Sequence, residues 1–192
     1  MSIVNDTIKL IKEFKPALLF LLKFLGMYVI LSIFYGIYVE SFDTNPDLVT
    51  IWVSEQTSGI LQWFNLDTSI YPMEDVPKVA LLLGERTVLN LYEGCNGLNV
   101  FVTFISFLFA FSGVVKPMLW FVPLGLFIIH LSNLGRIILL FFVAEHLPDY
   151  MYFTHKYLFT AAIYVAVFAL WVIWVKKYTS SQPKAIHNCQ LT

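Results

Sequence analysis

Apolar residues dominate this chain in four long runs that polar segments separate. The runs cover residues 17–39, 98–115, 118–143 and 157–175. A helix needs about 20 apolar residues to cross the hydrocarbon core of a bilayer, and the second run is near the short limit. The pattern predicts an all-α integral membrane protein with about four transmembrane helices, forming one multi-pass domain over residues 1–192.

The segment 40–97, between the first two runs, has patterns of its own. Six apolar residues recur near helical spacing: Leu48, Ile51, Trp52, Ile60, Trp63 and Phe64. This spacing predicts an amphipathic helix, which rests on the outer membrane face or packs on the protein. Further on, two β-prone runs flank Gly84-Glu85, a pair suited to a type II′ turn. We therefore expect a small β-hairpin that delivers the chain to Glu93 and Cys95.

Composition agrees with a membrane protein. Hydrophobic residues make up 58% of the chain and charged residues 13%, whereas soluble domains have about 45–50% and about 25%. The net charge is −1 and there is no basic patch, which argues against nucleic acid as a partner. The two cysteines, Cys95 and Cys189, are too far apart in sequence to suggest a disulfide framework.

The distribution of charges predicts the topology. Lysines gather before the first run, between the second and third, and after the fourth: Lys9, Lys12, Lys15, Lys116, Lys176, Lys177 and Lys184. Most acidic residues lie in segments 40–97 and 144–156. By the positive-inside rule both termini and the polar tail 178–192 are cytoplasmic, and those two acidic segments face outward. The first run lacks a small-residue cleavage site and is expected to remain as an anchor.

Three residues with useful chemistry then fall at the same outer level of the membrane. Cys95 precedes the second run, Arg136 lies in the outer half of the third, and His155 precedes the fourth. An arginine inside a membrane helix costs at least about 2.5–3.5 kcal/mol on insertion scales, so it needs a wet cavity or partners. Beside a guanidinium and an imidazole, a thiol can be activated as a nucleophile.

Each of these residues also has a structural alternative. Cys95 on its own is typical of a small buried hydrophobic residue. Arg136 can form an ion pair with Glu93 or Glu145. His146, in the last outer segment, competes with His155 as the base.

The neighbouring polar residues have supporting roles in this hypothesis. Asn133 lies one helical turn before Arg136 and can orient the guanidinium. Asn96 and Asn99 are expected to cap the second run, and Gly97 keeps the approach to the sulfur open. His130 is interpreted as a hydrogen-bonded histidine of the bundle. Cys95, His146 and His155 lack the paired spacing of metal ligands, so neither a metal nor a cofactor is expected.

The order and spacing of these motifs resemble one family. The sequences Glu93-Gly94-Cys95-Asn96-Gly97-Leu98 and Asn133-Leu134-Gly135-Arg136-Ile137, followed by His155, resemble the exosortase/archaeosortase family of membrane cysteine transpeptidases. The resemblance covers roughly residues 79–175, and the short chain is similar to the F-type subgroup. Typical members of the family are longer and have more spans than this chain, so the family's usual number of core spans does not carry over to it.

The resemblance implies a function and a location. Cys95, Arg136 and His155 correspond to the family's catalytic triad, with Asn133, Glu93 and Gly97 in supporting positions. The implied enzyme sits in the inner membrane of a bacterium, with its site on the extracytoplasmic face. It cleaves the C-terminal sorting signals of membrane-anchored surface proteins and transfers them to an envelope acceptor.

Two other functional classes stay open at this point. One is a non-catalytic factor that docks tailed surface proteins for assembly. The other is a transporter or channel subunit with Arg136 as a pathway charge, which the absence of a repeat or of a second intramembrane ion partner disfavours.

Overall fold

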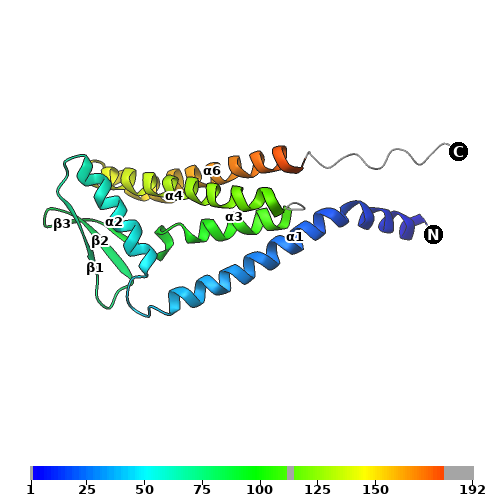
Figure 1. Ribbon diagram of the computed structural model, residues 1–192, viewed down its shortest axis with the longest axis horizontal. Helices are drawn as coiled ribbons and strands as arrows, with labels where there is room; N and C mark the ends of the chain where they lie inside the picture. Colours follow the sequence, from blue (N-terminus) through cyan, green and yellow to red (C-terminus); the bar gives the residue numbers. More distant parts are fainter. Residues whose placement is uncertain (1, 112–114, 180–192) are drawn as a thin grey trace.

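A computed structural model describes residues 2–111 and 115–179, and four long helices dominate it (Figure 1). The larger elements are α1 (Ser2–Glu40), α2 (Leu48–Trp63), β1 (Thr68–Pro72), β2 (Lys78–Leu83), β3 (Arg86–Tyr92), α3 (Leu98–Phe111), α4 (Val115–His146) and α6 (Phe159–Trp174). Short turns connect them: η1 (Glu93–Cys95), η2 (Pro148–Tyr150), α5 (Met151–Phe153), η3 (Thr154–Leu158) and η4 (Val175–Thr179). The long helices run roughly parallel to one axis, with the sheet and α2 at one end and both chain termini at the other.

Within the described residues, three stretches of helix are long and apolar enough to cross a membrane. They are Phe14–Glu40, Lys116–His146 and Pro148–Lys177. The predicted runs 17–39, 118–143 and 157–175 are therefore helical, and the last two begin earlier than predicted. The stretch that leads into α6 starts at Pro148 because η2, α5 and η3 continue into it.

The second predicted run differs from the structure. Its helix, α3, begins at Leu98 as expected but ends at Phe111, and the rest of the run includes residues 112–114, which lie outside the described residues. At about 1.5 Å per residue, the 14 residues of α3 span about 21 Å, which is shorter than a hydrocarbon core of about 30 Å. Most of the predicted tail, residues 180–192, also lies outside the described part of the chain.

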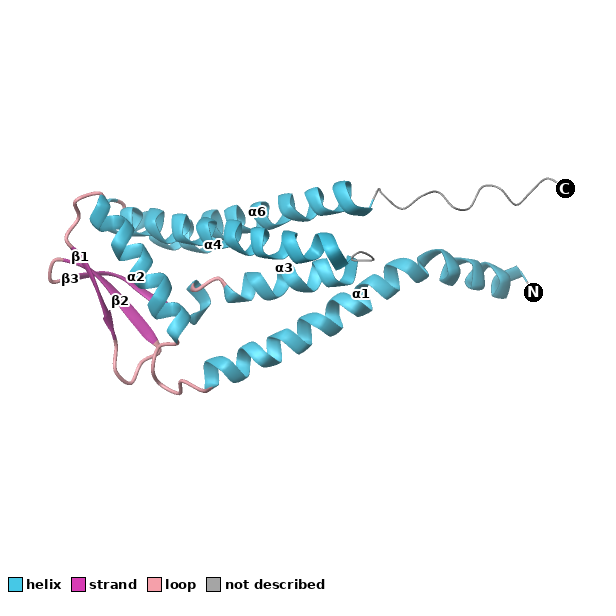
Figure 2. Cartoon of the chain, viewed as in Figure 1, coloured by secondary structure: helices cyan, strands magenta, loops and turns pink. Residues whose placement is uncertain are grey.

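The predicted hairpin is confirmed and belongs to a larger sheet (Figure 2). Strands β2 and β3 pair antiparallel, with Leu83 opposite Arg86 across Gly84-Glu85. Gly84 has a φ of +59° while Glu85 is not among the positive-φ residues, as a type II′ turn requires. Strand β1, which the sequence analysis missed, pairs with the other edge of β2 to give the order β1-β2-β3.

The predicted amphipathic helix is confirmed as α2, but its orientation is unexpected. Small polar residues, including Thr50, Ser54 and Thr57, face the protein and are buried. Trp52 and Trp63 on the opposite side are 51% and 88% exposed. Ser54 and Thr57 donate their hydroxyls to backbone carbonyls one turn back, so the inward face leaves no hydroxyl unpaired. The helix therefore packs on the protein through small polar residues together with Val53 and Leu61, while Trp52 and Trp63 remain on its outer side.

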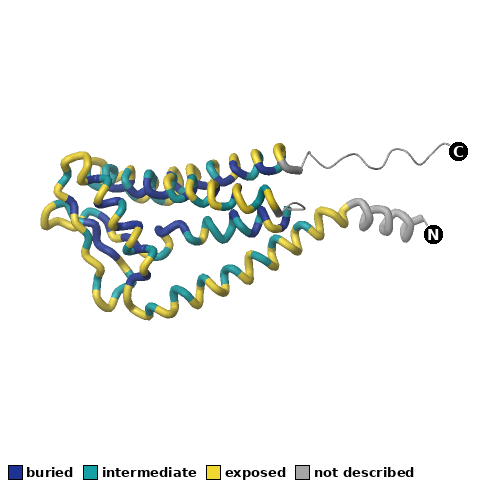
Figure 3. The backbone as a smooth tube through the Cα atoms, viewed as in Figure 1, coloured by how far each residue is buried: buried dark blue, intermediate teal, exposed yellow. Residues whose placement is uncertain are grey.

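Two buried clusters hold the described residues together (Figure 3). One lies between the sheet, α2 and the end of α4, and includes Leu81, Leu91 and Cys95. The other joins α3, α4 and α6 around Phe104 and Trp174. Helix α1 packs mainly against α3 and leaves most of its large apolar side chains exposed, as expected of a helix surrounded by lipid.

Candidate active site

Cys95 lies where the sheet meets the bundle. The η1 turn carries the chain from β3 to α3, and the side chain of Cys95 is only 4% exposed. Gly97 follows with a φ of +87°, a conformation that L residues rarely adopt, and a Cβ there would be 3.3 Å from Nδ2 of Asn133. The glycine is needed because the turn is tight and a buried amide packs directly against it.

Asn133 holds the turn from the side of α4. It is fully buried, and its Nδ2 donates to the carbonyl oxygen of Cys95 at 2.8 Å. Its Oδ1 accepts from Nη1 of Arg136 at 3.4 Å, one helical turn further on. The expected contact between Asn133 and Arg136 is present, and Asn133 also positions the backbone of Cys95.

Arg136 acts electrostatically on the other two candidate residues of the site. Its positive charge lowers the pKa of the thiol of Cys95 and also acts on the imidazole of His155. Among the described residues it forms no ion pair, and its Nε is buried without a hydrogen-bond partner. Glu145, one of its two expected carboxylate partners, pairs with Arg86 instead. The structural alternative for Arg136, an ion pair, is therefore not found in the described structure.

Cys95 and His155 line the same cavity. Its volume is about 520 Å³, and its walls come from β3 and from the segment between α4 and α6. Small-molecule and peptide pockets commonly range from about 300 to 1,000 Å³. His155 belongs to η3, a single π-helical turn, and such turns occur frequently at functional sites. Arg136 does not line this cavity in the described structure.

The other two histidines that the sequence analysis names, His130 and His146, lie elsewhere. His146 is exposed, and its Nδ1 is 3.1 Å from the carbonyl oxygen of Phe142 on its own helix. His130 is 2.7 Å from Oε1 of Gln56 and stacks on Trp52, so it is a hydrogen-bonded bundle histidine as predicted. Of the three histidines named by the sequence analysis, only His155 faces the cavity with Cys95.

Several effects shift the pKa of the Cys95 thiol in opposite directions. Burial raises the pKa of the thiol above its ordinary value, and this effect outweighs the rest. The charge of Arg136 and a hydrogen bond from the backbone N–H of Tyr92 lower the pKa, while the charge of Glu93 raises it. The charge of Arg136 therefore acts in the direction that activation of the thiol requires, but burial outweighs it. In the resting protein the sulfur carries its proton.

Glu93 and Asn96 contribute through structure. The carbonyl oxygen of Glu93 accepts from the hydroxyl of Tyr35 on α1 at 3.2 Å. Oδ1 of Asn96 accepts from the backbone N–H of Leu98 at 3.0 Å, so Asn96 caps the start of α3 as expected. The hydrogen bonds described for Asn99 involve its backbone carbonyl, which accepts from Thr103, so its predicted capping role is not seen.

Asp47 is the residue that the sequence analysis missed. Only 3% exposed, it accepts from the backbone N–H groups of Val49 and Thr50 at 3.0 Å and so caps α2. Nδ2 of Asn96 reaches its Oδ1 at 3.4 Å, and Tyr38 donates to the same oxygen. Its place directly before a helical pattern was a signal for a helix cap. Nothing local signalled the contact with Asn96, which comes from 49 residues away.

No family model, curated protein or solved structure matches this chain. Within the described residues, no group of three or more His, Cys, Asp or Glu side chains is arranged to hold a metal ion. The site is therefore interpreted from its own geometry.

Proposed function

We propose that this protein is a membrane cysteine peptidase or transpeptidase that acts on C-terminal sorting signals of surface proteins. One observation carries the proposal: Cys95 and His155 line one cavity, and the positive charge of Arg136, which no carboxylate neutralises among the described residues, acts on both. Residues from three separate segments supply a nucleophile, a base and a fixed positive charge, which is the set that acyl transfer requires.

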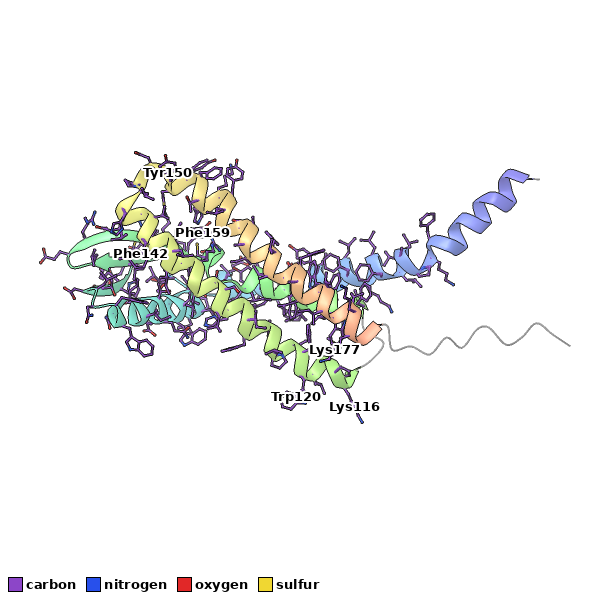
Figure 4. The ribbon with its side chains drawn as sticks, turned by 90° about the horizontal axis from the view of Figure 1, so that it is seen from above. Lys116, Trp120, Phe142, Tyr150, Phe159 and Lys177 are labelled. Carbon is purple, nitrogen blue, oxygen red and sulfur yellow. The ribbon has the colours of Figure 1, made fainter. Side chains whose placement is uncertain are left out.

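Helix lengths support a membrane position for this site. Lys116 and Lys177 lie at the end of the bundle opposite Tyr150 (Figure 4). Twenty residues of α4 separate Lys116 from Arg136, about 30 Å at about 1.5 Å per residue, which equals the thickness of a hydrocarbon core. With the lysines in the cytoplasm, Arg136 lies at the outer boundary of the bilayer.

Helix α1 supports the same depth of the site in the membrane. Lys15 and Tyr35 are also twenty residues apart, and Tyr35 bonds to the backbone beside Cys95. We count α3, which packs between α1 and α4, as a fourth span despite its length. This arrangement keeps both termini cytoplasmic and leaves α2 and the sheet on the outer side of the inner membrane of a bacterium, with the exposed face of α2 at the interface.

The chemistry follows from the placement of the three side chains. The thiol proton of Cys95 passes to His155 as the sulfur attacks the scissile carbonyl carbon. The guanidinium of Arg136, which is fixed by Asn133, stabilises the negative charge that develops at the sulfur and the carbonyl oxygen. His155 then returns the proton to the amine that leaves with the C-terminal fragment, and Cys95 retains the rest as a thioester. A nucleophilic group of an envelope acceptor then attacks the thioester and gives its proton to His155, which passes it to the departing sulfur of Cys95 and so restores the thiol.

Burial of the thiol favours a second candidate, a non-catalytic docking factor. The net rise of the pKa of Cys95 is what an inert buried cysteine also shows. In that case the cavity would hold the tail of a surface protein without cutting it. The two candidates differ in one outcome, namely whether bound tails are cleaved.

The test uses a reporter domain that ends in a short motif, one apolar helix and a basic cluster, taken from surface proteins encoded in the same genome. Produced together with the wild-type chain in bacterial membranes, the reporter should be shortened. Cys95→Ala should leave it full length, and His155→Ala should slow its processing about 10²–10⁴-fold. Arg136→Lys should also fail, because an ammonium cannot replace the planar fork of a guanidinium.

Two matched controls accompany these variants. His146→Ala removes an imidazole that is not part of the cavity lining, and Cys189→Ser removes the other cysteine of the chain; both variants should process the reporter normally. Normal processing by Cys95→Ala would refute the assignment of the nucleophile. Stable capture of an uncut reporter by the wild-type chain would favour the docking factor.

A further inference from the structure

The cavity has an unusual wall. Five consecutive residues of β3, from Val88 to Tyr92, line it, and Cys95 lies just beyond them. In the described sheet β3 pairs with β2 only, so its other side is a free edge. An edge strand presents unpaired backbone N–H and C=O groups, which can bind an additional strand.

The pairing pattern shows which groups of β3 are free. The N–H of Met73 donates to the carbonyl oxygen of Lys78 at 2.9 Å, so Lys78 directs its backbone groups toward the β1 side of β2. Ala80, two residues on, has the same orientation because the direction alternates along a strand. The residues opposite Lys78 and Ala80 on β3 are Tyr92 and Asn90. These two residues therefore turn their backbone groups away from β2.

The lining of the cavity agrees with this orientation. Asn90, Tyr92 and Cys95 all belong to it. The free edge of β3 and the nucleophile of the proposed mechanism thus face the same space. The opposite wall, with Leu140, Met151 and His155, is mostly apolar and offers side chains rather than a backbone edge.

We propose that the segment to be cleaved binds in this cavity as an extended strand added to the free edge of β3. Its backbone bonds to the N–H and C=O of Asn90 and to the C=O of Tyr92, and its alternate side chains face the apolar wall, which sets specificity. The strand is parallel to β3, because β3 leads into α3 just as the bound segment leads into its own membrane helix. Its scissile carbonyl is then delivered to Cys95. This inference rests on the proposed function, since it names how the substrate of that site is held.

The experiment maps contacts in a chain that cannot cleave. Cys95→Ala, Cys189→Ser and Asn90→Cys are combined in the full-length protein in lipid nanodiscs. Single cysteines are placed along the residues that precede the helix of the tailed reporter, and disulfide yield is measured under mild oxidation. An added strand predicts yields that alternate with a period of two residues, because successive side chains point to opposite faces.

A second variant tests the backbone directly. Asn90→Pro removes one N–H from the free edge without removing a bond to β2, a position where an edge strand accepts proline. In the Cys95→Ala background it should weaken capture of the reporter about tenfold. Asn90→Ala, which keeps the N–H, is the matched control and should bind as well as the parent.

The outcomes separate this inference from the proposed function. A period of three to four residues, or no period, would overturn strand addition even if the wild-type chain cleaves the reporter. Unchanged capture by a folded Asn90→Pro protein would overturn it as well. A period of two with no cleavage by the wild-type chain would support strand addition and refute the proposed catalysis. If Asn90→Pro fails to fold, the period of the cross-links alone decides.

Discussion

Replacing Asn133 by leucine removes the amide that joins α4 to the turn of Cys95, with little change in side-chain size. The carbonyl oxygen of Cys95 would lose a 2.8 Å bond in a buried position. Leaving such a group unsatisfied costs about 1–3 kcal/mol. The bond from Arg136 to Asn133 is long, 3.4 Å, and half-buried, so its loss adds little. We expect a net loss of about 2 kcal/mol in the free energy of unfolding.

A chain of this size changes its unfolding temperature by about 2–4 °C per kcal/mol, so Asn133→Leu should lower it by about 4–8 °C. Intrinsic tryptophan fluorescence in detergent measures this transition, because the chain has five tryptophans and Trp174 is buried. Ser132→Ala is the matched control, since its hydroxyl bonds only within α4 to the carbonyl of Ile128. An Asn133→Leu protein that unfolds within 1 °C of the Ser132→Ala protein would contradict the role given to this amide.

Four further predictions concern the same region. Because burial raises the pKa of Cys95, iodoacetamide should alkylate it slowly at pH 7 and faster as the pH rises. Arg136→Gln should slow alkylation at a given pH. An alkylation rate that reaches its plateau below pH 8 would contradict a protonated thiol. Because its pKa is raised in the folded state, the thiol favours folding at low pH, and this contribution to stability declines as the pH rises through the folded-state pKa. Thermal melts of the wild-type protein and of Cys95→Ala at a series of pH values will measure the difference. Both Gly97 and Gly84 have a positive φ, but a Cβ at Gly97 would be 3.3 Å from a buried amide, whereas a Cβ at Gly84 would meet open space. Gly97→Ala should therefore reduce reporter processing, and Gly84→Ala should not. Asp47→Ala removes a helix cap worth about 0.5–2 kcal/mol and should lower the unfolding temperature in the same fluorescence assay.

Local patterns in the sequence were sufficient for most of the elements. A two-residue turn centred on a glycine predicted the β2–β3 hairpin, because the geometry of that turn depends on the residues in it. Helical spacing predicted α2 for the same reason. Strand β1 was missed because Thr68–Pro72 is short and ends in proline, and it is held by β2 and by Ser58 and Gln62 of α2.

The orientation of α2 could not be predicted from its pattern. A helix with apolar residues on one side normally buries that side in a water-soluble protein. In this chain the small polar side is buried and Trp52 and Trp63 are exposed. Hydroxyls of the buried side bond to the backbone of the helix, and the two tryptophans then remain free for contact with lipid. Which side of such a helix is buried depends on its surroundings.

The sequence by itself determined the apolar helices, the hairpin and the list of candidate residues, because hydrophobic length, turn chemistry and the cost of an arginine in a membrane helix are local properties. Only the tertiary structure decided that Arg136 lies beside Cys95 without a carboxylate, that His155 and not His146 lines the cavity, and that the free edge of β3 forms its wall. It also decided the charge state of Cys95, because burial depends on every segment packed around the sulfur and its effect on the pKa exceeds that of the neighbouring guanidinium.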